Sequence, residues 1–146
     1  MISRAVLAIA ALAIGMTAVV AQDLLAERKT YMRGNNTHHR NLRVIVSGEQ
    51  PYDQAKVDAA FAQWAETAQK FPGFFPDDTK SAENTRALPR IWETRDDFNA
   101  KVASFAKAVA ENRDKIKNLD DLKANFPVIN KTCDDCHELY RAPARR

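Results

Sequence analysis

The chain has 146 residues, with 22 lysines and arginines against 19 acidic residues and a formal net charge of +3. This length suits one domain with one core. The weak, dispersed positive charge gives no argument for nucleic-acid binding. No serine–histidine–acid set, glycine-rich phosphate loop or carboxylate pair with an evident pocket indicates an enzyme.

The first 21 residues have the pattern of an export signal. A short positive start containing Arg4 precedes an apolar run from Ala5 to Val20, and Ala21 is the small residue expected at a cleavage site. A membrane anchor is the alternative, but the run is slightly short for a span and no stop-transfer flank follows it. We therefore expect cleavage after Ala21, a periplasmic location, and a mature domain over residues 22–146 without a stable membrane span.

Four amphipathic segments follow, and no stretch is convincing as a strand. The predicted first helix runs from about Asp23 to Ser47, with Gly48 as its C-cap. Its inner stripe repeats at spacings of three and four, as in a packed bundle. The stripe consists of Leu24, Arg28, Tyr31, Asn35, His38, Leu42 and Ile45. A bundle helix with polar groups on its inner face usually reserves that face for a cofactor.

The second predicted helix has a clean apolar face. It opens at Pro51–Asp53, where proline suits a helix start, and it ends at Phe71–Gly73. Its inner positions are Val57, Phe61, Trp64, Ala68 and Phe71. The proline-containing stretch over residues 72–90 predicts a long crossover loop, which some helix bundles use in place of a short hairpin.

The third and fourth predicted helices complete the chain. Thr94–Asp97 resembles a capping box that starts the third helix, and Asn118 or Asp120 caps the fourth. Pro127 should kink the fourth helix or restart it. The basic tail over residues 142–146 is expected to be a frayed, solvated terminus. The four segments predict an all-α bundle around one core.

The dominant motif is Cys133-Asp134-Asp135-Cys136-His137, which uses both cysteines of the chain. A spacing of three on a helix places both thiols on one face, where they can form thioethers with one haem, and the following histidine can bind the iron. A disulfide here would stabilise the fold little. Zinc would need two more ligands, with only His38 and His39 left, and a thioredoxin-like role needs a strand–helix context. The motif therefore predicts one covalently attached haem c.

With this motif near its end, the mature chain resembles the class II c-type cytochromes, which include cytochrome c′ and the low-spin cytochromes c-556. Cys133–Arg141 resembles the closing motif of that family, Gly48–Asp53 its first inter-helix turn, and Ala87–Trp92 the segment before its third helix. Arg28 followed by Met32 resembles the haem-contact pattern of its first helix. The resemblance implies an antiparallel four-helix bundle with haem c held between the helices, often as a homodimer.

The resemblance also implies roles for single residues. Cys133 and Cys136 would attach the haem, and His137 would be the proximal iron ligand. Arg28 would approach a propionate, because its planar guanidinium can bind a carboxylate. An ordinary surface arginine is the alternative for Arg28.

Three further positions bear on the haem contacts. Lys29 stands where cytochromes c′ commonly have glutamine, and Arg90 stands where an acidic residue is common. Lys29 is kept as a candidate haem contact, although this departure puts the family's contacts there in doubt. Arg141 lies four residues after His137 on the same helical face, so it is a candidate to influence the proximal side.

Met32 decides between two functions. It lies four residues after Arg28 on the same helical face, and in the c-556 members a methionine there binds the iron opposite the histidine. His137–Met32 ligation would give a six-coordinate, low-spin haem suited to electron transfer. Alternatively Met32 is core, since methionine fills irregular gaps, and the iron stays open. His38 or His39 as sixth ligand is a third arrangement.

We therefore expect a periplasmic electron carrier, not an enzyme, with one haem c, His137 and Met32 as iron ligands, and redox partner proteins. The alternative is a five-coordinate, high-spin cytochrome c′ that binds a small gas, NO or CO. A third hypothesis is a haem-free helical interaction protein, which would be colourless after purification.

Overall fold

The structure, a computed structural model, describes residues 4–80, 82 and 84–144, with side chains from Asp23 onward. The predicted export signal over residues 1–21 falls on residues 1–3, outside this description, and on a stretch whose side chains are not described. Cleavage after Ala21 therefore stays a prediction. Where side chains are described, no helix is long and apolar enough to cross a membrane.

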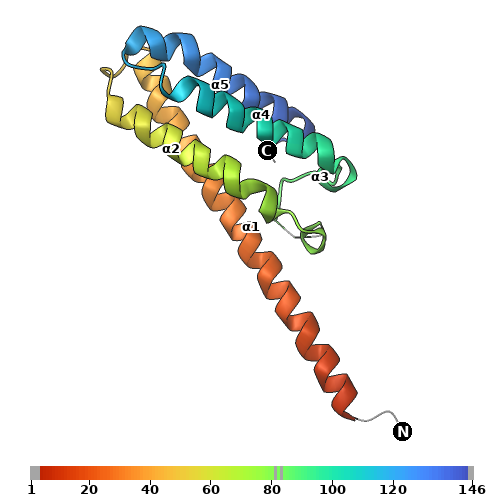
Figure 1. Ribbon diagram of the computed structural model, residues 1–146. Helices are drawn as coiled ribbons and strands as arrows, with labels where there is room; N and C mark the ends of the chain where they lie inside the picture. The colour runs from red at the N-terminus through yellow and green to blue at the C-terminus, as the bar shows by residue number, and fades with distance from the viewer. Residues whose placement is uncertain (1–3, 81, 83, 145–146) are drawn as a thin grey trace.

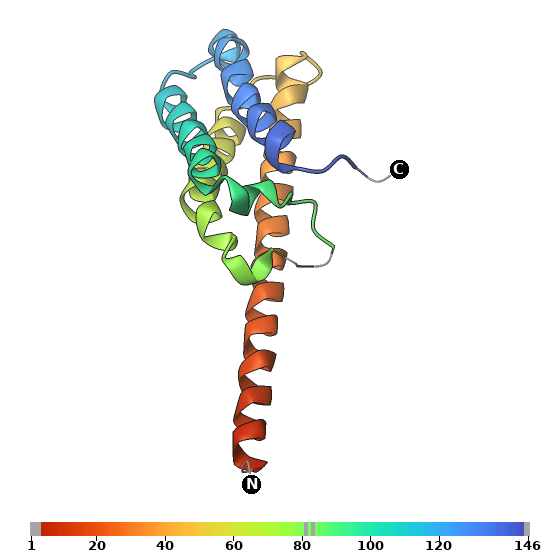
Figure 2. The ribbon, with the colours of Figure 1, turned by 90° about the vertical axis from the view of Figure 1, so that its right-hand side faces the viewer.

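Four long helices form an antiparallel bundle (Figure 1). They are α1 (Arg4–Val46), α2 (Gln54–Lys70), α4 (Arg95–Arg113) and α5 (Leu119–Tyr140). The first part of α1 extends beyond the other helices in both ribbon views (Figures 1 and 2). No strand occurs among the described residues; one isolated antiparallel bridge joins Ala87 to Arg141. The predicted all-α four-helix bundle is confirmed.

Local chemistry explains several helix ends. Gly48 has φ +82°, a left-handed conformation that glycine adopts without a Cβ penalty, and its N–H donates to the carbonyl of Ile45. The Asp53 side chain caps α2 by accepting from the N–H of Lys56, and Asn118 caps α5 by accepting from the N–H of Asp121. Gly48 and Asn118 thus act as predicted, whereas the cap by the Asp53 side chain was not among the predictions.

The connection between α2 and α4 is more ordered than a loop. It contains the 3₁₀ turns η1 (Phe71–Phe74) and η2 (Asp77–Thr79) and the short helix α3 (Arg90–Glu93). Figure 2 shows this connection crossing the end of the bundle beside α1. The sequence predicted the crossover but not these turns.

Two expectations about helix boundaries were wrong. The Thr94 side chain does not cap α4; its hydroxyl donates to the carbonyl of Arg90, because the same residue also ends α3. Of the two outcomes expected at Pro127, the restart is likewise wrong, since α5 runs through the proline, and the kink stays a prediction. Phe126 and Ile129 are buried on either side of the proline, and this packing holds the helix together despite the missing N–H donor.

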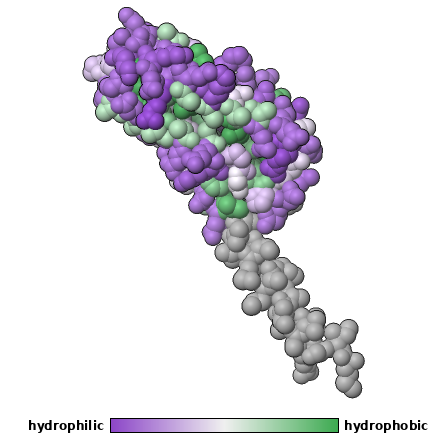
Figure 3. All heavy atoms as spheres, in the orientation of Figure 1, coloured by the Kyte–Doolittle hydropathy of each residue, from purple (hydrophilic) through white to green (hydrophobic). Residues whose placement is uncertain are grey.

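The helices bury two apolar clusters. The turn-end cluster lies near the α1–α2 and α4–α5 turns and comprises Leu42, Ile45, Val57, Ala60, Phe61, Trp64, Ala108, Val109, Ile116, Leu122, Phe126 and Ile129. The aromatic cluster lies at the other end and comprises Phe74, Phe75, Ile91, Phe98, Val102 and Tyr140. On the face seen in Figure 3, hydrophilic residues surround narrower apolar areas of the bundle.

Candidate haem site

The two cysteines lie on α5 beside the aromatic cluster. Both are half-buried and free, and Cys136 packs directly against the cluster. Burial raises the pKa of each thiol to about 11, with Asp134 adding to the effect at Cys133. The thiols are therefore protonated at neutral pH, which does not suit a redox thiolate or a thiolate-bound metal. Among the described residues no group of three or more metal-binding side chains occurs.

His137 follows Cys136 on the same helix and is half-buried. Its Nδ1 lies 3.3 Å from a guanidinium nitrogen of Arg141. Burial lowers the pKa of His137, and the charges of Arg141 and Arg86 lower it further, against an opposing effect of Asp134. The neutral imidazole, which is the form that binds a metal, is thereby favoured.

The chain end after His137 pairs with the segment before α3. The N–H of Ala142 donates to the carbonyl of Arg86 at 2.8 Å, and Arg86 Nε donates back to the carbonyl of Ala142 at 2.8 Å. The N–H of Leu88 donates to the carbonyl of Tyr140 at 3.0 Å. The expectation of a frayed tail is therefore wrong at Ala142. A shallow hollow of about 490 Å³ lies here, lined by Arg86, Leu88, Asp134, His137, Glu138, Arg141, Ala142 and Pro143.

Arg28 is the most unusual side chain at this end. It is only 4% exposed, and none of its three guanidinium nitrogens has a hydrogen-bond partner. Its guanidinium lies 4.6 Å from the centroid of the Phe75 ring, and burial lowers its pKa. The surface-arginine alternative is therefore wrong. A buried, unpaired guanidinium is costly, so this position calls for an anionic partner.

The remaining candidates lie on or near α1. Met32 is half-buried, one turn beyond Arg28, and neither apolar cluster, as the described side chains form them, includes it. Lys29 is exposed, as is Arg90 at the start of α3. His39 packs on the Phe126 ring with centroids 5.1 Å apart.

Sequence reasoning missed several residues of this region. Phe75 carries the Arg28 guanidinium on its ring. The Tyr140 hydroxyl donates to Asp97 at 2.5 Å. The carbonyl oxygen of the Asn130 side chain is buried without a partner. The aromatic richness of residues 71–75 was the one available signal, but nothing in the sequence places Phe75 against the first helix.

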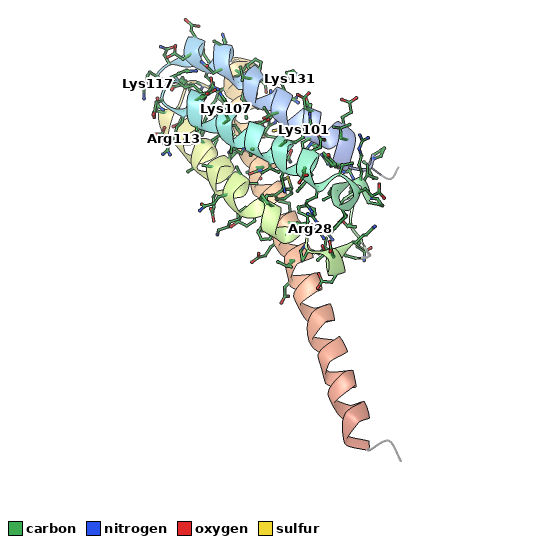
Figure 4. The ribbon with its side chains drawn as sticks, turned by 45° about the vertical axis from the view of Figure 1, so that its right-hand side comes forward. Arg28, Lys101, Lys107, Arg113, Lys117 and Lys131 are labelled. Carbon is green, nitrogen blue, oxygen red and sulfur yellow. The ribbon has the colours of Figure 1, made fainter. Side chains whose placement is uncertain are left out.

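The residues at this end fit a haem. A porphyrin is a flat apolar group, which suits the aromatic surroundings of Cys136, and its propionates are the kind of anion that Arg28 lacks. Figure 4 shows Arg28 at the end of the bundle beside the connection from α2 to α4, with Lys107, Arg113 and Lys117 toward the other end. The buried, unpaired Arg28 guanidinium is thus separated from the turn-end cluster.

Comparison with known proteins also indicates a c-type cytochrome. The family model described as Cytochrome C' matches residues 23–141. Cytochrome c-556 of Rhodopseudomonas palustris is 41% identical, with 94% of this chain and 96% of the relative covered. The solved cytochrome c′ of the same organism has a TM-score of 0.80 at 32% identity, covering 84% of this chain and 98% of the other.

A third similar structure is a nitric oxide complex of a mutant of cytochrome c prime from Alcaligenes xylosoxidans. It has a TM-score of 0.72 at 25% identity and covers 84% of this chain and 97% of the other. These proteins are cytochromes, so the hypothesis of a haem-free interaction protein is wrong. The chain belongs to the cytochrome c′ family of class II c-type cytochromes, whose cofactor is covalently bound haem c.

Proposed function

We propose that this protein is a periplasmic electron carrier whose haem c is attached through Cys133 and Cys136 and ligated by His137 and Met32. The observation that carries the proposal is the position of Met32. It lies half-buried on the same side of α1 as the buried Arg28, yet it belongs to neither apolar cluster. A methionine that only filled a gap in the core would be expected within one of them.

Each residue has a separate task in this proposal. The two thiols hold the cofactor covalently, so it cannot dissociate from the exported protein. His137 on α5 and Met32 on α1 would offer the iron one ligand each, from different helices. Arg28 supplies a cation for a propionate. When bound, the haem provides a one-electron iron couple, and thioether ligation raises its reduction potential.

The relatives bear on this choice. The 41% identical relative is a cytochrome c-556, a name that the low-spin members carry. Export is proposed from the pattern of residues 1–21, and covalent haem attachment outside the cytoplasm is consistent with it. Redox partner proteins and a homodimer remain predictions.

A second candidate function is binding of a small gas at an open iron. The observation that favours it is the nitric oxide complex of the related Alcaligenes protein. In that case Met32 would lie beside the iron without a bond, and the protein would be five-coordinate and high-spin.

One spectroscopic experiment separates the two functions. We expect the purified wild-type protein to show a sharp low-spin visible spectrum that carbon monoxide leaves unchanged. Met32→Ala should convert it to a broad high-spin spectrum that shifts with the gas. Thr30→Ala, an exposed position on the same helix, is the matched control and should keep the wild-type spectrum. A Met32→Ala spectrum identical to wild type would rule out Met32 ligation.

A further inference from the structure

Phe75 links Arg28 to the connection between α2 and α4. Its ring stands beside the Arg28 guanidinium, with 4.6 Å from the guanidinium carbon to the ring centroid. The ring is held by its neighbours: Phe71 and Phe98 each lie 5.0 Å away and Trp92 lies 5.8 Å away, all edge-on. The position of the Phe75 ring therefore limits the positions that the Arg28 guanidinium can occupy.

The backbone of Phe75 depends on a residue of another element. Phe75 follows η1 with φ −127° and ψ 49°, so it is not part of a regular helix. Its carbonyl accepts a 2.6 Å hydrogen bond from the guanidinium of Arg95, at the start of α4. A charged donor makes such a bond stronger than an ordinary amide would.

Arg95 also organises the surroundings of the ring. Its guanidinium carbon lies 5.9 Å from the centroid of Trp92, and the Trp92 indole N–H donates to the carbonyl of Pro76 at 3.1 Å. Arg95 thus contacts both the backbone of Phe75 and a ring that packs on it. The 3.8 Å approach to the fully exposed Asp77 carboxylate adds little.

We propose that Arg95 is a positioning residue, which holds Phe75 and through it the Arg28 guanidinium, and thereby tunes the reduction potential of the haem. The inference rests on the proposed role of Arg28 at a haem propionate. A cation held near the haem opposes the extra positive charge of ferric iron and so favours the reduced state. When Arg95 no longer holds Phe75, the Arg28 guanidinium becomes more mobile and better hydrated, and its effect on the iron weakens.

The test is a double-mutant cycle on the midpoint potential of the haem-loaded protein at pH 7, measured by spectroelectrochemistry. Arg95→Gln should lower the potential, and Arg28→Gln should lower it more. Adding Arg95→Gln to Arg28→Gln should cause no further change, because Arg95 acts through Arg28. A direct charge effect of Arg95 would instead persist in the double variant, and that additive outcome would overturn the proposal.

Arg113→Gln is the matched control. It removes the same charge from the same helix, at the end of the bundle away from Arg28 (Figure 4). We expect its potential to equal that of the wild type. If Arg28→Gln left the potential unchanged, the assigned role of Arg28 would fail. If only Arg95→Gln left it unchanged, the positioning role alone would fail.

A second pair of variants tests the proposal without touching Arg95. Phe75→Leu removes the ring beside Arg28 but keeps an apolar side chain and the backbone carbonyl. Phe61→Leu makes the same change to a buried ring of the turn-end cluster, away from Phe75. The first should lower the potential and the second should leave it near wild type. Equal reduction potentials for these two variants would contradict the proposal that Phe75 positions Arg28. This test holds even if Arg95→Gln yields no folded protein.

Discussion

The turn-end cluster and the aromatic cluster lie in one bundle, but their polar neighbours differ. Near the turn end, the buried Asn112 side chain donates to the carbonyl of Ala108 at 2.7 Å, so its amide is satisfied. At the aromatic end, the buried Arg28 guanidinium has no partner, and the half-buried thiols of Cys133 and Cys136 remain free. The Asn112 amide finds its partner within the chain, whereas Arg28 and the two cysteines are suited to a group that the chain does not supply.

This difference explains why the impure stripe of the first helix matters. Leu42 and Ile45 are fully buried in the turn-end cluster, where apolar packing alone is sufficient. Arg28, about four turns before Leu42, interrupts the same stripe beside the aromatic cluster. A single helix thus contributes to a core at one end and to a cofactor site at the other.

The largest expected effect is at the aromatic end. Cys133→Ser with Cys136→Ser should abolish covalent haem, because no thioether can form. Haem staining of a denaturing gel should be negative for this double variant. Asp134→Asn changes only the spacer between the cysteines and should stay positive. A stained double variant would show that attachment does not depend on these thiols.

The turn-end cluster should respond through stability alone. Ile129 is fully buried, so Ile129→Ala should lower the free energy of unfolding by about 2–5 kcal/mol through a lost contact and a cavity. Its neighbour Val128 is 46% exposed, and Val128→Ala should change that free energy by about 0.5 kcal/mol or less. Urea unfolding of the haem-loaded protein measures both. A change in the visible spectrum of folded Ile129→Ala would contradict the independence of the two ends.

Arg28→Met should have opposite effects with and without haem. In the haem-free Cys133→Ser/Cys136→Ser chain, it replaces an unpaired buried charge by an apolar side chain and should raise the free energy of unfolding by about 1–4 kcal/mol. In the haem-loaded protein the same substitution removes the cation that binds a propionate, so it should lower the free energy of unfolding.

Arg33→Met is the control for this prediction. Arg33 is exposed on the same helix, and its replacement should change the free energy of unfolding by about 0.5 kcal/mol or less in either state. Urea titrations followed by circular dichroism give the values. If Arg28→Met lowered the free energy of unfolding of the haem-free chain, the buried guanidinium would not be an unpaired charge that costs stability.

The smallest effect concerns Tyr140, where burial first and then the hydrogen bond to Asp97 raise the pKa of the phenol. The folded state therefore holds this proton more tightly than the unfolded state. Its contribution to stability is complete below the unfolded pKa of about 10 and is lost as the pH rises above it. Tyr140→Phe should cost about 1 kcal/mol at pH 7 and should reduce the alkaline loss of stability.

Unfolding titrations between about pH 8 and 11 test this last prediction. The pKa of Tyr52 is also raised by burial, so some alkaline loss should remain in Tyr140→Phe. Tyr52→Phe serves as the comparison variant, because it changes a tyrosine beside the turn-end cluster instead. If Tyr140→Phe left the decrease of the free energy of unfolding with pH unchanged, the pKa of the Tyr140 phenol would not differ between the folded and unfolded states.

Much of the fold could be predicted because its signals are local. Gly48 and Asp53 mark the turn between α1 and α2 through their own backbone and side-chain chemistry. The capping box at Thr94 was wrong because Thr94 also ends α3, a helix too short to show periodicity. The pairing of residues 86–88 with the chain end could not be predicted, since it joins segments more than 50 residues apart.

The sequence by itself determined that this is a c-type haem protein of bundle architecture, because the C-x-x-C-H spacing and the helical stripes act over one or two turns. Only the tertiary structure decided that Arg28 is buried without a partner, that Phe75 lies beside it and that Arg95 holds Phe75. These contacts join α1, the crossover and α4. Whether a side chain is buried depends on which elements pack against it, and a local sequence pattern does not determine that packing.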